Sequence, residues 1–126
     1  MRWSILVVDD QPAVAEVVRR VLEREGHRVT VATRPLDALG VFTERGSDFD
    51  LVISDLVMPD LQGPALIARM MELRPVPRVL FMSGHADADT LATSGNHPIL
   101  AKPFTPDELC QAIVRLALRG SPTPER

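Results

Sequence analysis

Four short, mostly apolar runs occur along the chain, and each ends beside a polar residue. Runs of this length bounded by polar residues predict buried β-strands. Residues 5–8 lead into Asp9 and Asp10, residues 51–54 into Asp55, residues 79–82 into Ser83, and residues 99–101 into Lys102. A fifth strand is predicted at residues 28–32.

Amphipathic helices are predicted between these strands. Between residues 10 and 26 the inward stripe includes Val14, Val17 and Val18, and Gly26 ends the helix. A second helix is expected at residues 35–45, and a third places Leu66, Met70 and Leu73 inward. A weaker helix is expected at residues 86–93.

The last helix has the clearest start. Thr105 is followed by Pro106 and, three residues after the threonine, by Glu108. This order combines a capping hydroxyl, a proline at the first helical position and a capping-box glutamate. Five strands thus alternate with five helices, which predicts an α/β fold with a parallel sheet covered on both faces.

The order of the elements places all the polar strand-end residues in one cleft, because parallel strands joined by crossover helices share one carboxyl edge, where ligands bind. Carboxylates close together repel, and a divalent cation removes that cost. An oxygen-only ligand set favours Mg²⁺, and an aspartate at a strand end can attack phosphorus. Lys102, the only lysine beside thirteen arginines, supplies a compact ammonium for a phosphoryl oxygen.

The chain has 126 residues, so one domain is expected at residues 1–120, with a flexible tail at 121–126. A net charge of −3 argues against direct binding of nucleic acid. The sequence has no apolar stretch of membrane-spanning length, so we expect a cytoplasmic protein without membrane insertion. The single Cys110 cannot form an intrachain disulfide, and His27 is expected in an exposed turn.

The five motif positions together resemble the receiver domain of two-component response regulators, particularly receivers of hybrid histidine kinases or stand-alone regulators. The motif comprises Asp9-Asp10, Asp55, Ser83 and Lys102-Pro103-Phe104. The resemblance implies a flavodoxin-like fold with strand order 2-1-3-4-5. It also implies a Lys102–Pro103 bond that is usually cis.

The resemblance also implies a role for each site residue. Asp55 would accept a phosphoryl group from a histidine kinase or a histidine phosphotransfer protein. Asp10, Asp55 and the Val57 carbonyl would hold Mg²⁺, with Asp9 helping through water. Ser83 and Lys102 would contact the phosphoryl group, and the changed conformation would act on an output protein or domain. Such a module catalyses only its own phosphorylation and dephosphorylation.

Two other functions stay open at this point. A haloacid-dehalogenase-type phosphatase also uses an aspartyl nucleophile after a strand, although that family requires an Asp-x-Asp pair and here Gln11 and Pro12 follow two adjacent aspartates. An interaction module that works without phosphorylation is the second alternative, and it is disfavoured because every motif position is present.

Overall fold

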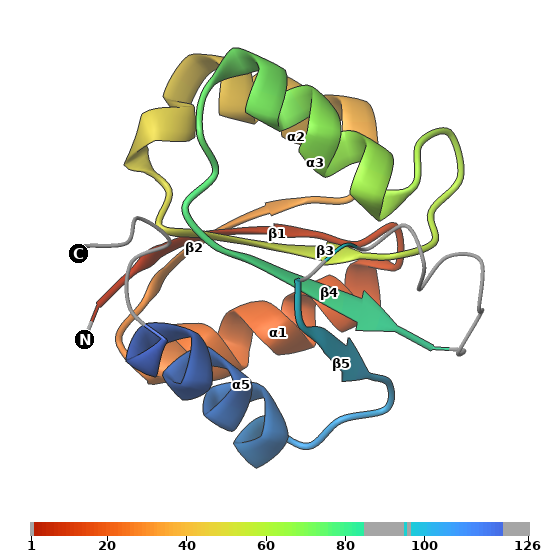
Figure 1. Cartoon of the computed structure of the whole chain (residues 1–126). Coiled ribbons are helices and arrows are strands. Elements are labelled where there is room, and N and C mark those ends of the chain that lie inside the picture. The colour runs from red at the N-terminus through yellow and green to blue at the C-terminus, as the bar shows by residue number, and fades with distance from the viewer. Residues whose placement is uncertain (1, 85–94, 96, 120–126) are drawn as a thin grey trace.

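Five parallel strands form the centre of the computed structural model, which describes residues 2–84, 95 and 97–119. The sheet order is β2-β1-β3-β4-β5, as predicted from the resemblance (Figure 1). The strands are β1 (Ser4–Val8), β2 (Arg28–Ala32), β3 (Leu51–Asp55), β4 (Val79–Ser83) and β5 (Ile99–Ala101). The order reverses beside β1, so the carboxyl ends of β1 and β3 meet where this fold class binds ligands.

Helices cover both faces of the sheet and produce three layers (Figure 1). α1 (Pro12–Arg24) and α5 (Pro106–Leu118) pack on one face. α2 (Pro35–Arg45), α3 (Gly63–Leu73) and the short 3₁₀ helix η1 (Gly46–Asp48) lie on the other. The predicted helix at 86–93 and the predicted tail at 121–126 lie outside the described residues. No described helix is long and apolar enough to cross a membrane.

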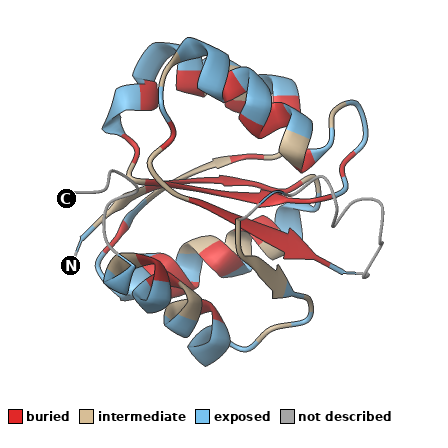
Figure 2. Ribbon diagram, in the orientation of Figure 1, coloured by how far each residue is buried: buried red, intermediate tan, exposed pale blue. Residues whose placement is uncertain are grey.

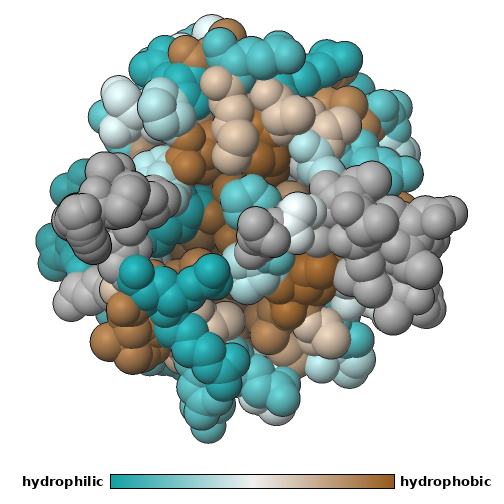
Figure 3. All heavy atoms as spheres, in the orientation of Figure 1, coloured by the Kyte–Doolittle hydropathy of each residue, from teal (hydrophilic) through white to brown (hydrophobic). Residues whose placement is uncertain are grey.

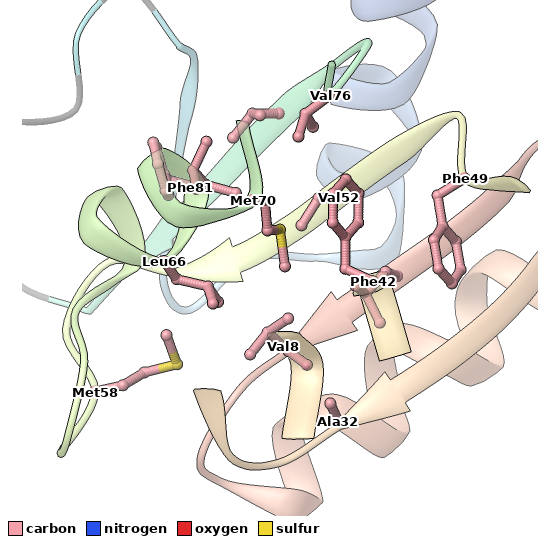
Figure 4. Packing of buried hydrophobic residues seen from close by; sticks show 14 of the residues in the cluster. Val8, Ala32, Phe42, Phe49, Val52, Met58, Leu66, Met70, Val76 and Phe81 are labelled. Carbon is pink, nitrogen blue, oxygen red and sulfur yellow. The ribbon is translucent and has the colours of Figure 1, made fainter. Parts of the chain in front are cut away.

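The alternation of side chains along β1 divides the core into two clusters. Leu6 and Val8 join the cluster under α2 and α3, whereas Ile5 and Val7 join the cluster over α1 and α5. Figure 2 shows that the central strands β1, β3 and β4 are mostly buried between helices whose outer faces are exposed. In the first cluster, Phe42 and Met70 approach Val52 from the helical layer (Figure 4). The central strands, which lead into the polar residues, are therefore packed on both faces.

The predicted capping box at the start of α5 is confirmed. The Glu108 amide donates to Thr105 Oγ1 at 3.1 Å, and the Thr105 amide donates to Glu108 Oε1 at 2.8 Å. These two bonds satisfy amide groups that a helix start leaves without intrahelical partners, and removal of such a cap typically costs about 1 kcal/mol. The cap fixes α5 directly after the turn that carries Lys102.

Three sequence predictions about burial are wrong. Val17 is 55% exposed because Ala15, together with Val18, occupies the inward face of α1. Leu73 is 48% exposed at the last position of α3. His27 is buried, because its Nδ1 accepts a hydrogen bond from the Trp3 amide at 3.0 Å. Helical periodicity identified the right helices, but it did not fix which of two neighbouring apolar residues faces the sheet.

Candidate functional site

Three carboxylates meet at the carboxyl ends of β1 and β3. Val8 lies opposite Ser54 in the strand register, so Asp9 and Asp55, the next residues of each strand, become neighbours. Asp9, Asp10 and Asp55 each offer a carboxylate oxygen within 4.8 Å of the others. Asp9 is fully buried, Asp55 is 7% exposed and Asp10 is partly exposed. The parallel topology therefore brings together the acidic residues that the sequence predicted at one edge.

Lys102 completes the charged site from β5. Its Nζ lies 3.0 Å from Asp9 Oδ2 and 3.3 Å from Asp55 Oδ2, so one ammonium bridges two carboxylates. The Lys102 amide donates to the Ser83 carbonyl at 2.7 Å, which aligns the end of β5 with the end of β4. The Lys102–Pro103 peptide is cis, as the resemblance implied. This ammonium compensates part of the negative charge of the site.

A cleft of about 370 Å³ opens over these groups, and it contains most of the predicted site residues. It is lined by Asp10, Gln11, Asp55, Val57, Ser83, Gly84 and Lys102. Ser83 is buried, whereas Val57 is 51% exposed. Asp9 is buried beneath the cleft lining. His85, which the sequence pattern places in the loop after Ser83, lies outside the described residues.

The structure adds two roles that the sequence did not reveal. The Gln11 amide donates to Asp9 Oδ1 at 2.9 Å, which holds the buried carboxylate from the side opposite its lysine contact. Gly63 packs so closely on β3 that a Cβ there would lie 2.3 Å from the Asp55 backbone oxygen. The sequence shows that residue 63 is a glycine. Only the structure shows that a larger residue there would collide with the Asp55 backbone.

The electrostatic environment of Asp55 opposes its ionisation. Burial, and then the negative charge of Asp9, raise the pKa of Asp55 to about 6, even though Lys102 acts in the opposite direction. Asp55 therefore ionises less readily than an ordinary aspartate. The Lys102 ammonium supplies the positive charge that favours the ionised form of Asp55.

Metal-free stability should fall as the pH rises through about 6. Because the pKa of Asp55 is higher in the fold than in the unfolded chain, its stabilising contribution is complete below the unfolded value and is lost as Asp55 ionises. Thermal unfolding in EDTA at pH 5 and pH 8 should show this loss, and Asp55→Asn should reduce the difference between the two pH values. An unchanged difference in Asp55→Asn would assign the pH dependence to other groups.

The three carboxylates fit a divalent cation with oxygen ligands. Mg²⁺ typically takes one or two carboxylates and retains waters, and this donor set and spacing satisfy that requirement. Mg²⁺ at one hundred times its dissociation constant should add about 2.7 kcal/mol to the free energy of unfolding.

Asp10→Asn should stabilise the metal-free protein by reducing repulsion and should weaken Mg²⁺ binding. Melting temperatures with and without Mg²⁺ test both effects; a lower metal-free melting temperature for Asp10→Asn would contradict the repulsion argument.

Comparison with known proteins identifies the class that this fold and site define. The family described as the response regulator receiver domain matches residues 5–114. The chain belongs to that family. It is a receiver domain of the kind that two-component signalling systems use.

Individual relatives agree with this assignment. The chain is 32% identical to the sensor kinase CckA of Brucella abortus over 87% of its own length and 12% of that protein. It is 31% identical to sporulation initiation phosphotransferase F of Bacillus subtilis, covering 90% of this chain and 92% of that one. The chain thus spans a small part of some relatives and nearly all of others.

Solved structures show the same fold. A response regulator receiver domain protein from Clostridium thermocellum superimposes with a TM-score of 0.81 at 32% identity, covering 92% of this chain and 94% of that one. The receiver domain of the hybrid histidine kinase CckA gives 0.78 at 29% identity, covering 90% and 97%. The fold is therefore that of receiver domains.

Proposed function

We propose that Asp55 is the phosphoacceptor and that it takes a phosphoryl group from the phosphohistidine of a histidine kinase or histidine phosphotransfer protein. An Asp55 oxygen forms the new bond to phosphorus as the histidine nitrogen–phosphorus bond breaks, and the released imidazole nitrogen takes a proton. Asp10, Asp55 and the Val57 carbonyl would hold Mg²⁺, and Asp9 would act through water. When bound, this cation neutralises charge on the transferring oxygens.

One observation carries the proposal: Lys102 bridges Asp9 and Asp55 inside a cleft that also contains Ser83. The Lys102 ammonium lies 3.3 Å from Asp55 Oδ2. At this distance it could form an ion pair with an oxygen of a phosphoryl group attached to Asp55. The buried Ser83 lies on the neighbouring strand end, where its hydroxyl would contact the same group. Phosphorylation adds negative charge at Asp55, so Lys102 and the ends of β4 and β5 are expected to move toward it.

Mass spectrometry after incubation with acetyl phosphate and Mg²⁺ tests this function. The wild-type chain should gain the mass of one phosphoryl group, and EDTA should prevent the gain. Asp55→Asn should show no gain, whereas Asp50→Asn, which changes a carboxylate at the other end of β3, is the matched control and should label normally. Labelling of Asp55→Asn would place the phosphoacceptor elsewhere.

The same incubation separates the two other functions. A haloacid-dehalogenase-type phosphatase would turn over phosphoesters continuously, a behaviour that neither the family match nor the adjacent Asp9-Asp10 pair supports. An interaction module would remain unlabelled at every time. We propose that the chain catalyses only its own phosphorylation and dephosphorylation and that it works in the cytoplasm, where kinase-derived phosphoryl groups are made.

An apolar groove beside the cleft suits the phosphohistidine partner. The groove has a volume of about 510 Å³ and shares Gly84 and Lys102 with the phosphoacceptor cleft. Its apolar lining comes from the start of α1 and from the turn after β5: Ala13, Val14, Val17, Pro103 and Phe104. A protein that delivers a phosphoryl group into the cleft must cover the surrounding surface. We therefore propose that the partner's helix places apolar side chains in this groove.

Val17→Glu should slow phosphotransfer from a phosphohistidine protein at least tenfold, because it introduces a charge into the proposed interface. Labelling by acetyl phosphate should stay unchanged, since Val17 is 55% exposed and does not line the phosphoacceptor cleft. The measurement follows radioactive phosphoryl transfer from any histidine phosphotransfer protein that labels the wild-type chain. Leu36→Glu on α2, where Leu36 is 58% exposed, is the matched control. Equal rates for both variants would exclude the groove as the docking surface.

A further inference from the structure

The side chain of Gln11 has no part in the chemistry described so far, although the residue lines the phosphoacceptor cleft. Its backbone is held firmly. The Gln11 amide donates to Asp9 Oδ1 at 2.9 Å, and the Gln11 carbonyl accepts from the amides of Val14 and Ala15, both at 3.1 Å. Within the described start of α1, the Gln11 side chain makes no capping hydrogen bond. Gln11 therefore carries a carboxamide that is not used to cap its helix, on a backbone that is fixed.

Gln11 lies between the phosphoacceptor and the solvent. Asp55 is only 7% exposed at the base of the cleft, whereas Gln11 is exposed at its rim. Displacement at phosphorus is roughly in line, so a water that removes a phosphoryl group from Asp55 must approach from the side opposite the Asp55 oxygen. That side is the open side of the cleft, and Gln11 forms part of its rim.

A carboxamide at this rim can accept and donate hydrogen bonds without adding charge. The other described lining residues are less suited to hold a water molecule. Val57 and Gly84 have no polar side-chain group, and Lys102 can only donate and already bridges two carboxylates. Figure 3 shows hydrophobic residues at the surface over β4 and β5, the strands farthest from Gln11 along the cleft. Gln11 is therefore the neutral rim residue that can orient a water.

We propose that Gln11 is a positioning residue for the water that hydrolyses the phosphorylated Asp55, so that it sets the lifetime of the phosphorylated state. The water would donate a hydrogen bond to Gln11 Oε1, and Gln11 Nε2 would donate to a phosphoryl oxygen. The water oxygen forms a bond to phosphorus as the bond between phosphorus and the Asp55 oxygen breaks. Asp55 leaves as a carboxylate, and the inorganic phosphate keeps both protons of the water. This inference rests on the proposed phosphorylation of Asp55.

The half-life of the phosphorylated chain tests this role. The full chain is labelled with radioactive acetyl phosphate and Mg²⁺, the donor is removed, and the release of inorganic phosphate is followed. Gln11→Leu, which has a similar volume but no hydrogen-bonding group, should lengthen the half-life about fivefold, the usual effect of one hydrogen bond. Gln62→Leu is the matched control, because Gln62 is an exposed glutamine that also precedes a helix without capping it and does not line the cleft. Its half-life should equal that of the wild type.

Gln11→Glu tests the hydrogen bond itself. The glutamate keeps an acceptor oxygen at the same reach, so its half-life should be no longer than that of the wild type, although its charge should slow the labelling step. A purely structural role would not separate the leucine and glutamate variants in this way. A glutamate variant as long-lived as the leucine variant would overturn the proposal.

Gln11→Ala separates positioning of the water from shielding of the site. Alanine removes the carboxamide and widens the rim, so loss of positioning lengthens the half-life, whereas loss of a shield shortens it. A shorter half-life in Gln11→Ala, or a wild-type half-life in Gln11→Leu, would overturn the proposal. Melting temperatures verify that each variant is folded. A wild-type chain that takes no label would overturn the proposed function as well, whereas labelled variants with equal half-lives would overturn this inference alone.

Discussion

Lys102→Met should lower the free energy of unfolding of the metal-free protein by about 3 kcal/mol at neutral pH. Asp9 is fully buried, and Lys102 Nζ at 3.0 Å is its cationic partner among the described residues. The methionine keeps most of the side-chain volume but leaves the carboxylate without a counter-ion. The Gln11 amide still donates to Asp9, which keeps the expected loss at the lower end of the range for a broken buried ion pair. Urea unfolding in EDTA measures the change.

The pH dependence separates a lost ion pair from a loss of packing. Without Lys102, the two carboxylates that it bridged repel each other more strongly. Protonation of Asp55, whose pKa is already raised to about 6, should relieve part of that cost. The effect of Lys102→Met should therefore be smaller at pH 5 than at pH 8. Arg20→Met, which breaks an exposed pair with Glu16, is the matched control and should change stability little. Equal effects of the two variants would refute a dominant role for the buried pair.

The sequence predicted the placement of the acidic residues correctly because topology alone decides it. In a parallel sheet the carboxyl ends of the strands must share an edge, so apolar runs that end in Asp9, Asp55 and Lys102 predict a common cleft before any coordinates are known. The family match and the strand order confirm the fold on which this reasoning depended. The chemical roles of these residues remain our proposal.

The sequence could not predict side-chain contacts between residues that are far apart along the chain. The sequence suggested Lys102 as a phosphate ligand, but only the structure shows its ammonium already bridging Asp9 and Asp55. The burial of His27 was missed because its partner, the Trp3 amide, lies 24 residues away in the chain. Local patterns describe neighbours along the chain, whereas these contacts join elements that the fold brings together.

The bridging lysine also suggests how the signal leaves the site. A phosphoryl group on Asp55 would compete with Asp9 for the Lys102 ammonium, and Lys102 is joined through Pro103 and Phe104 to the capped start of α5. We therefore expect a shift of Lys102 to displace the turn that precedes α5. The partly buried Ile99 in β5 packs against the core, so β5 is in contact with the rest of the domain along this route.

Gly63→Ala should destabilise the protein by about 2 kcal/mol and reduce phosphorylation of Asp55 by acetyl phosphate. The added Cβ would lie 2.3 Å from the Asp55 backbone oxygen and 3.1 Å from the Phe81 ring. The oxygen belongs to a central strand, so relief requires α3 or the end of β3 to move. Movement of the end of β3 would displace Asp55 relative to Asp10 and Lys102. Urea unfolding measures the first effect, and the initial rate of mass gain measures the second.

Gly40→Ala in α2 is the matched control, because the same substitution is expected to stabilise the protein there. Apart from its chain neighbours and the backbone of its own helix, no described atom lies within 4 Å of the position where a Cβ on Gly40 would be placed. Alanine there should stabilise the fold by about 0.5–1 kcal/mol through helix propensity alone. The same substitution should therefore have opposite effects at two glycines of one protein. A stabilised Gly63→Ala variant that is phosphorylated at the wild-type rate would show that the contact with Asp55 relaxes without consequence.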